Sequence, residues 1–257
     1  MPSQTWLPVT NELAFIRQAF RDTADHDYIA ARALYRFELD QQFLWSAEQA
    51  TEKYLKAILL YNGCDTSKVG HDLSLALEQV SKIDGLEIDL PDDVGEFVSE
   101  LAVCGVNRYL QYPSFTSEED LLMLDKTVWH LRRYCDYLRG TYTNSRGEHV
   151  EALPANVKRI QSSVGSEKPR QLWFTNGVLE RVLTDRRSVL WNSLVWENLF
   201  FGPCRGRSLG SISLRSRSMN PMHFLDPNLF HAIKARVRFP KAVHQYFEDL
   251  EKHAGDQ

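Results

Sequence analysis

Residues 41–61, QQFLWSAEQATEKYLKAILLY, form the clearest helical pattern in the chain. Apolar residues recur in it at spacings of three and four, from Phe43 to Leu59, and so form one broad face. Asn62 and Gly63 follow directly, and this pair is typical of a helix end. A helix with so wide an apolar face needs neighbouring helices to bury it.

Four further stretches carry the same period of apolar residues and predict further helices. They cover residues 11–40, about 71–80, 91–107 and 117–139. Residues 23–27 interrupt the first stretch with Thr and Asp, which favour helix caps, so two helices are expected there. Because only short joints separate the helices, residues 1–140 are predicted to form an antiparallel helical bundle.

The composition changes after residue 140. Residues 141–170 have little periodicity and are expected to form a linker, with one helical turn at 154–161. Asn176 and Gly177 then stand between two apolar stretches, which is a strong signal for a β-hairpin over residues 172–182.

The remaining segments complete a second unit. Residues 186–201 are rich in apolar residues from Val189 to Phe201, and a buried strand and a buried helix both fit them. Within residues 237–250 a last helix is expected to start after Pro240 and to end at Leu250. The predicted fold class is therefore mainly α, with the N-terminal bundle followed by a smaller, basic α+β or mixed module over residues 171–257.

The formal net charge of −4 on 257 residues averages two halves of opposite sign. Residues 1–140 hold 13 Lys and Arg against 23 Asp and Glu, whereas residues 141–257 hold 17 against 11. A basic half of this kind indicates a polyanionic partner, but the two halves could equally pair with each other.

Composition and motifs exclude several classes of protein. With 43% hydrophobic and 25% charged residues the chain is neither disordered nor collagen-like. No apolar run is long enough for a membrane span, and the N-terminus lacks the pattern of a signal peptide, so a cytoplasmic protein with no membrane partner is expected. The four cysteines form no C-x-x-C pair, and no P-loop or zinc motif occurs, so neither a metal nor a cofactor is expected.

Several short motifs within residues 11–139 resemble those of the HEPN family. These motifs are Asp27-Tyr28 with Ala31-Arg32, the block Gln49–Leu59, Gly63, Gly70-His71-Asp72-Leu73 and Asn107–Pro113. The resemblance implies a helical domain concerned with nucleotide or RNA chemistry, which pairs with a second copy into a homodimer. It also implies a nucleotidyltransferase as a further partner.

The same block supplies a candidate phosphate site. Glu52 and Lys56 form an i, i+4 pair, and Lys53 lies on an adjacent face of the helix. The full candidate set for nucleotide or phosphate binding is Arg32, Glu52, Lys53, Lys56, His71, Asp72, Arg108 and Tyr109. Cations facing one groove could hold a phosphate. A salt-bridged surface helix is the alternative for the Glu52–Lys56 pair, and a helix N-cap is the alternative for Asp72.

Nuclease members of the family carry Arg-x(4–6)-His, which cleaves RNA without metal. Arg108 is the counterpart of the arginine, but the positions for the histidine hold Pro113, Ser114 and Phe115. This departure argues against ribonuclease activity. A composite catalytic site of Arg108 with His71, or of Arg21 with His26, would be needed instead.

The basic half has its own candidates, Arg205, Arg207, Arg215 and Arg217, which could contact nucleic-acid phosphates. The alternatives are a solvated loop or a docking segment for the acidic half. The expected function is a nucleotide- or RNA-binding component of a prokaryotic defence or toxin–antitoxin system. An active endoribonuclease toxin is the first alternative, and a non-catalytic protein–protein interaction module is the second.

Overall fold

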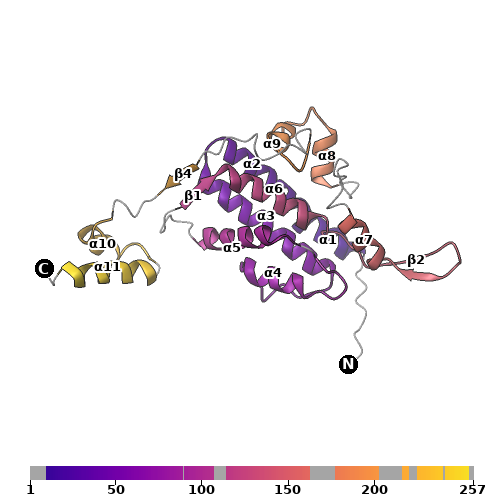
Figure 1. Cartoon of the computed structure of the whole chain (residues 1–257), viewed down its shortest axis with the longest axis horizontal. Helices are drawn as coiled ribbons and strands as arrows, with labels where there is room; N and C mark the ends of the chain where they lie inside the picture. The colour runs from indigo at the N-terminus through magenta and orange to yellow at the C-terminus, as the bar shows by residue number, and fades with distance from the viewer. Residues whose placement is uncertain are drawn as a thin grey trace, which may run out of the picture.

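The computed structural model describes residues 10–88, 90–106, 114–162, 177–202, 216–219, 225–239 and 241–254. A bundle of helices forms its centre (Figure 1). The bundle consists of α1 (Thr10–Ile16), the π-helical turn η1 (Arg17–Asp22), α2 (Thr23–Arg36), α3 (Asp40–Tyr61), α4 (Leu73–Ser81), α5 (Asp92–Val106) and α6 (Glu118–Arg132). The fold is mainly α, as the sequence predicts.

Helix α3 is the predicted helix of residues 41–61, and it packs against α2, α4, α5 and α6. Its buried face includes Phe43, Tyr54 and Leu59, none of which is exposed to solvent. Gly63 follows its end with φ of 73°, a left-handed conformation that glycine adopts without strain. The most periodic stretch of the sequence is therefore the central helix of the core.

The cap predicted at residues 23–27 is wrong, because helical backbone continues from η1 into α2. The side chain of Asp25 does not cap a helix. Its buried carboxylate accepts hydrogen bonds from Arg132 Nε at 2.7 Å and from Tyr54 Oη at 2.8 Å. A polar residue that looks like a helix start is thus the interior partner of a distant arginine.

Residues 141–162 contain more structure than the predicted linker with one helical turn. Strands β2 (Thr141–Thr143) and β3 (His149–Glu151) form an antiparallel hairpin, and helix α7 (Leu153–Ser162) follows. Leu153, Val157 and Ile160 lie on one face of α7 and join the hydrophobic core of the bundle. Burial of this apolar face is what holds α7 in place.

The β-hairpin predicted around Asn176 and Gly177 is wrong for the part that the structure describes. Residues 178–184 form helix α8 (Val178–Thr184), and the short helix α9 (Trp191–Val195) follows. Val178, Leu179 and Val182 repeat at helical spacing and are buried in the core of the bundle, so tertiary packing overrides the turn signal. Residues 172–176 lie outside the described residues.

Where one domain ends and the next begins stays a prediction. The main hydrophobic cluster runs from Ile16 to Phe201 and so takes in α7, α8 and α9 with the helical bundle. This packing favours counting residues 178–201 with the bundle rather than with a separate module. No helix within the described ranges is both long and apolar enough to cross a membrane.

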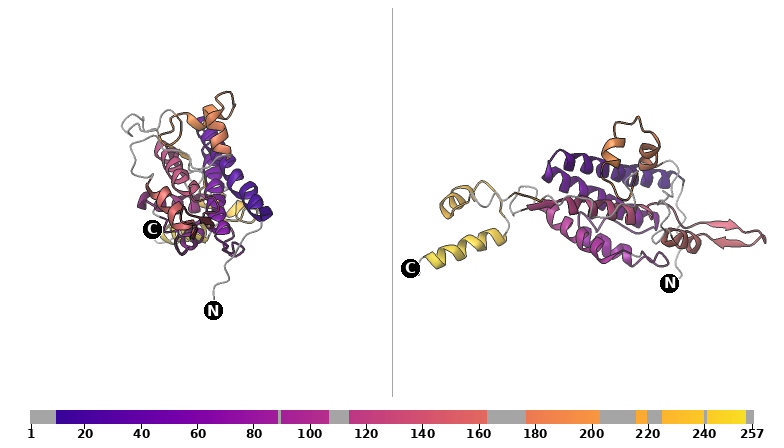
Figure 2. Two further views of the ribbon diagram at one scale, coloured as in Figure 1. Left: turned by 90° about the vertical axis from the view of Figure 1, so that its right-hand side faces the viewer. Right: turned by 45° about the horizontal axis from the view of Figure 1, so that its top comes forward.

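A pair of short strands joins the C-terminal part to the bundle. Strand β1 (Ser114–Ser117) precedes α6 and pairs antiparallel with β4 (Ser216–Met219). Beyond β4 lie α10 (Pro227–Ile233) and α11 (Lys241–Ala254), and the second of these is the helix predicted after Pro240. These two helices stand to one side of the bundle in Figure 1 and in the right-hand view of Figure 2.

Candidate functional site

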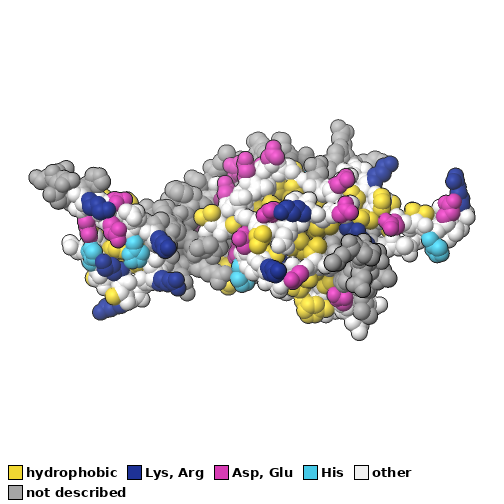
Figure 3. All heavy atoms as spheres, turned by 90° about the horizontal axis from the view of Figure 1, so that it is seen from below, with side chains coloured by type: hydrophobic (Ala, Val, Ile, Leu, Met, Phe, Trp, Pro, Cys, Tyr) yellow, Lys and Arg dark blue, Asp and Glu magenta, His cyan; other side chains and the backbone are white. Residues whose placement is uncertain are grey.

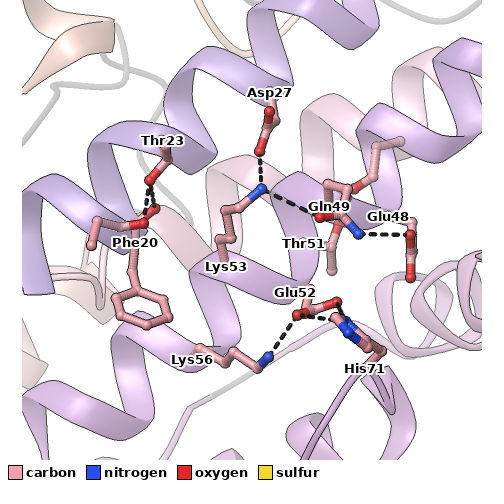
Figure 4. Close-up of polar contacts among 12 residues, drawn as sticks. Phe20, Thr23, Asp27, Glu48, Gln49, Thr51, Glu52, Lys53, Lys56 and His71 are labelled. Carbon is pink, nitrogen blue, oxygen red and sulfur yellow. Dashed lines mark hydrogen bonds and ion pairs between the residues drawn. The ribbon is translucent and has the colours of Figure 1, made fainter.

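Two neighbouring helices bring part of the predicted phosphate set together. Glu52, Lys53 and Lys56 lie on α3, while His71 and Asp72 lie in the turn that precedes α4 (Figure 4). Helix α4 begins where the sequence predicts, because Asp72 caps it by accepting a hydrogen bond from the amide of Leu75 at 2.9 Å. The cap fixes the turn and therefore the position of His71 beside α3.

Glu52 is the centre of this cluster. Its side chain is only 6% exposed, and one carboxylate oxygen accepts a hydrogen bond from Lys56 Nζ at 2.6 Å. The other oxygen lies 3.0 Å from His71 Nδ1. Burial alone would raise the pKa of Glu52, but the hydrogen bonds from Lys56 and His71 hold this pKa below its ordinary value.

The ionised carboxylate also determines which ring nitrogen of His71 carries a hydrogen. A carboxylate can only accept hydrogen bonds, so Nδ1 of His71 carries the hydrogen and donates it to Glu52. The His71 side chain is 73% exposed. Its Nε2 has no hydrogen bond to the residues that the structure describes, and the exposed ring leaves it accessible from solvent. We name Glu52, Lys56 and His71 the α3–α4 cluster.

Lys53 lies beside this cluster rather than in it. Its Nζ pairs with the carboxylate of Asp27 on α2 and lies 3.4 Å from Gln49 Oε1. Figure 4 shows the Asp27–Lys53–Gln49 contacts as a group separate from the Lys56–Glu52–His71 group. Both side chains of the Asp27–Lys53 pair are about a quarter to a third exposed, so the charge of Lys53 is partly neutralised at the surface.

Arg32 does not belong to the site, and its predicted phosphate contact is wrong. Its side chain is fully buried, with 0% exposure. The guanidinium pairs with Asp125 of α6 and donates to the backbone carbonyls of Ser193 and Trp196. Because all of these groups are interior, Arg32 joins α2, α6 and α9 and cannot reach a ligand at the α3–α4 cluster.

A sequence signal for the buried pair exists, although the prediction missed it. Asp125 falls within the apolar stripe of α6 marked by Leu121, Leu124 and Val128. An acid inside such a stripe needs a buried cation as its partner. Burial raises the pKa of Asp125, and the pairing with Arg32 opposes that rise.

Of the two composite nuclease sites, the structure describes both residues of only one. Arg21 is buried and pairs with Asp22, whereas His26 is exposed on α2, so the two side chains stand in different environments and a site shared by them stays a prediction. Arg108 and Tyr109 lie outside the described residues, so the combination of Arg108 with His71 stays a prediction.

The basic loop of the second half is described at one position only. Arg205, Arg207 and Arg215 lie outside the described residues. Arg217, in β4, pairs with Asp40 at 2.6 Å and lies 4.8 Å from the centre of the Tyr35 ring. The hydrogen bond to Asp40 raises the pKa of Arg217, which fixes its positive charge. The structure thus places Arg217 against the acidic half, in line with the docking alternative.

Comparison with protein families supplies an independent finding. Residues 18–127 match the family model described as the HEPN domain, a range that contains α2–α5 and most of η1 and of α6. Comparisons with curated proteins and with solved structures find no match. The matched range includes all three residues of the α3–α4 cluster.

Proposed function

We propose that this chain, whose residues 18–127 form a HEPN domain, binds a nucleotide or an RNA phosphate at the α3–α4 cluster. In this proposal it is a component of a prokaryotic defence or toxin–antitoxin system. The family match supports the role in a defence or toxin–antitoxin system, and the geometry of the α3–α4 cluster supports the binding of a phosphate.

One observation carries the binding proposal. The buried carboxylate of Glu52 holds both a lysine and a histidine, and the histidine is 73% exposed. When His71 is protonated, its Nδ1–H donates to Glu52 and its Nε2–H can donate to a phosphate oxygen. Lys56, held at the same carboxylate, adds a second positive charge.

An endoribonuclease is the second candidate, and the same cluster favours it. A carboxylate that binds one nitrogen of a histidine orients the ring and leaves the other nitrogen for proton transfer. Glu52 and His71 have this arrangement, with Nε2 on the exposed side. This candidate also needs a cation to stabilise charge on the scissile phosphate, and Arg108 is the residue proposed for it.

A binding assay tests the first proposal. Mononucleotides and short ribo-oligonucleotides are titrated into the full-length protein, the His71→Ala variant and the Lys56→Met variant. We expect each variant to lose between about 10-fold and about 100-fold in affinity, since a hydrogen bond to a charged group contributes about 1.5–3 kcal/mol. Lys82→Met is the matched control, because Lys82 also pairs with a glutamate four residues earlier but has no histidine beside it. Equal affinity of all four proteins would refute the proposal.

A cleavage assay separates the two candidates. Labelled RNA is incubated with the parent, His71→Ala and Arg108→Ala proteins in the presence of EDTA. Binding without cleavage by the parent supports the binding protein. Cleavage by the parent that both substitutions abolish supports the endoribonuclease instead.

We also propose that the protein forms a homodimer through its helical bundle and that a nucleotidyltransferase is a further partner, as the family relationship suggests. The interaction-module alternative has one contact in its favour, the Arg217–Asp40 pair between the basic and acidic halves. The molar mass in solution, measured by light scattering across salt concentrations, tests the dimer. A monomer at all protein and salt concentrations would contradict it.

A further inference from the structure

Helices α10 and α11 form a unit with its own small core, which we name the C-terminal helix pair (residues 225–254). Phe230 stacks on Phe247, with ring centroids 4.4 Å apart and planes inclined by 12°. Val243 completes the buried set, and Leu225 and Phe239 pack around it. This core is separate from the main hydrophobic cluster, so the pair can present a surface independently of the HEPN domain.

The connection between the two helices is strongly basic. Residues 234–241 read KARVRFPK, with four cations and no acid in eight residues. The four cations are Lys234, Arg236, Arg238 and Lys241, and all four are exposed. Arg236 and Lys241 form no ion pair with any residue in the described ranges. Figure 3 shows dark-blue side chains gathered on the C-terminal helix pair, at the left of the view.

The charges of α11 run against the helix dipole. Cations are favourable at the C-terminal end of a helix and acids at its N-terminal end. Helix α11 begins with Lys241 and has no acid in its first turn, whereas Glu248, Asp249 and Glu251 lie in its second half. The positive end of the α11 dipole therefore adds to the positive potential of the connection, since no acidic side chain stands in the first turn of α11.

We propose that the basic connection of the C-terminal helix pair binds the phosphate backbone of a single-stranded nucleic acid. The cations follow one another along the chain, which suits a row of phosphates better than a single small anion. Tyr246, on the same helix and 57% exposed, provides an aromatic surface on which a base can stack. This site lies outside the residues that match the HEPN model and is independent of the α3–α4 cluster.

Salt dependence provides the test, because each phosphate contact to a single strand changes the slope of log K against log salt by about 0.7. Fluorescence anisotropy of labelled 20-nucleotide RNA and DNA strands is recorded with the full-length protein between 50 and 300 mM NaCl. The variant is Arg236→Gln/Lys241→Gln. We expect its slope to be shallower than that of the parent by about 1.4, with about 25-fold weaker binding at 0.1 M salt.

The control variant Lys82→Gln/Lys252→Gln changes the net charge by the same amount. Lys82 pairs with Glu78, and Lys252 pairs with Asp249 in the second half of α11. We expect its slope and affinity to equal those of the parent. Circular dichroism spectra are expected to be the same for all variants, because every substituted side chain is exposed.

Four results would overturn the proposal. The first is an equal loss in the control, and the second is a slope that Arg236→Gln/Lys241→Gln leaves unchanged. The third is equally tight binding of duplex DNA or heparin, because the surface would then attract any polyanion. The fourth is self-association of the parent at low salt without binding of either strand, which would assign the basic connection to the acidic bundle of a second copy.

Discussion

Replacing Arg32 with methionine is expected to destabilise the protein severely. The substitution leaves the Asp125 carboxylate buried without its cation, and breaking a buried ion pair in this way costs about 3–5 kcal/mol. The carbonyls of Ser193 and Trp196 lose a donor as well, at about 1 kcal/mol each. The expected loss of about 5–7 kcal/mol is comparable to the whole free energy of unfolding of many domains.

Removing both charges should cost less than removing one. In the double variant Arg32→Met/Asp125→Leu no charge is left buried, and Tyr28 still has a hydrogen bond from the side-chain amide of Asn198 at 2.9 Å. We expect the double variant to lose about 2–4 kcal/mol, chiefly from the two carbonyls and from the Tyr28 hydroxyl, which loses its acceptor. A second substitution that recovers stability is the signature of a buried pair.

The assay is urea unfolding followed by circular dichroism, with Arg36→Met as the control. Arg36 is exposed on the same helix, one turn further on, and lies over the Trp196 ring at 5.6 Å. Its substitution should cost less than about 1 kcal/mol. The reasoning would be refuted by an Arg32→Met variant as stable as Arg36→Met, or by a double variant less stable than the single one.

The pKa of Asp125 provides a second test, because it predicts the direction in which stability changes with pH. Burial raises the pKa of this carboxyl in the folded protein, and loss of the Arg32 charge raises it further. A group whose pKa is higher in the folded state stabilises the protein at low pH, and this contribution disappears as the pH rises through the folded pKa. The Arg32→Met variant should therefore become more stable relative to the parent as the pH is lowered from 8 to 5. A constant difference over this range would contradict the assignment.

Three further predictions concern single residues. Gly177→Ala should lower the free energy of unfolding in urea by about 2 kcal/mol, because the added Cβ would overlap the Glu180 carboxylate. Gly140→Ala is the control and should cost far less, because its Cβ meets no atom within 4 Å. Asp72→Ala should cost about 1 kcal/mol by removing the cap of α4, measured the same way. Glu52→Gln should have a lower free energy of unfolding than the parent at pH 7, because the pKa of Glu52 is lowered on folding. The difference in free energy between the two proteins should disappear as the pH falls through that pKa. A difference that grows in acid would contradict the assignment.

The sequence predicts the elements whose signals are local. Helix α3 follows from its own period, the start of α4 from Asp72, and the start of α11 from Pro240. The Glu52–Lys56 contact follows from helical spacing alone. His71 could be named as a candidate, but its contact with Glu52 depends on how α4 packs against α3.

The features that could not be predicted from the sequence depend on residues far along the chain. Arg32 looks like a surface cation until Asp125, 93 residues later, is known to be its partner. The turn signal at Asn176 and Gly177 is overridden because the core of the bundle accepts α8 as a helix. Both errors have one physical cause, since local propensity is a weaker influence than burial against residues far along the chain.

Helix α9 is synthesised well after the helices that it packs against, and this order affects folding on the ribosome. The carbonyls of Ser193 and Trp196 that bind Arg32 emerge more than 60 residues after the end of the matched HEPN segment at residue 127. At about 5–20 residues per second the nascent bundle waits about 3–14 s for them. During that interval the Arg32–Asp125 pair remains without two of its hydrogen bonds. The complete native fold therefore cannot form until the segment beyond residue 190 has left the exit tunnel.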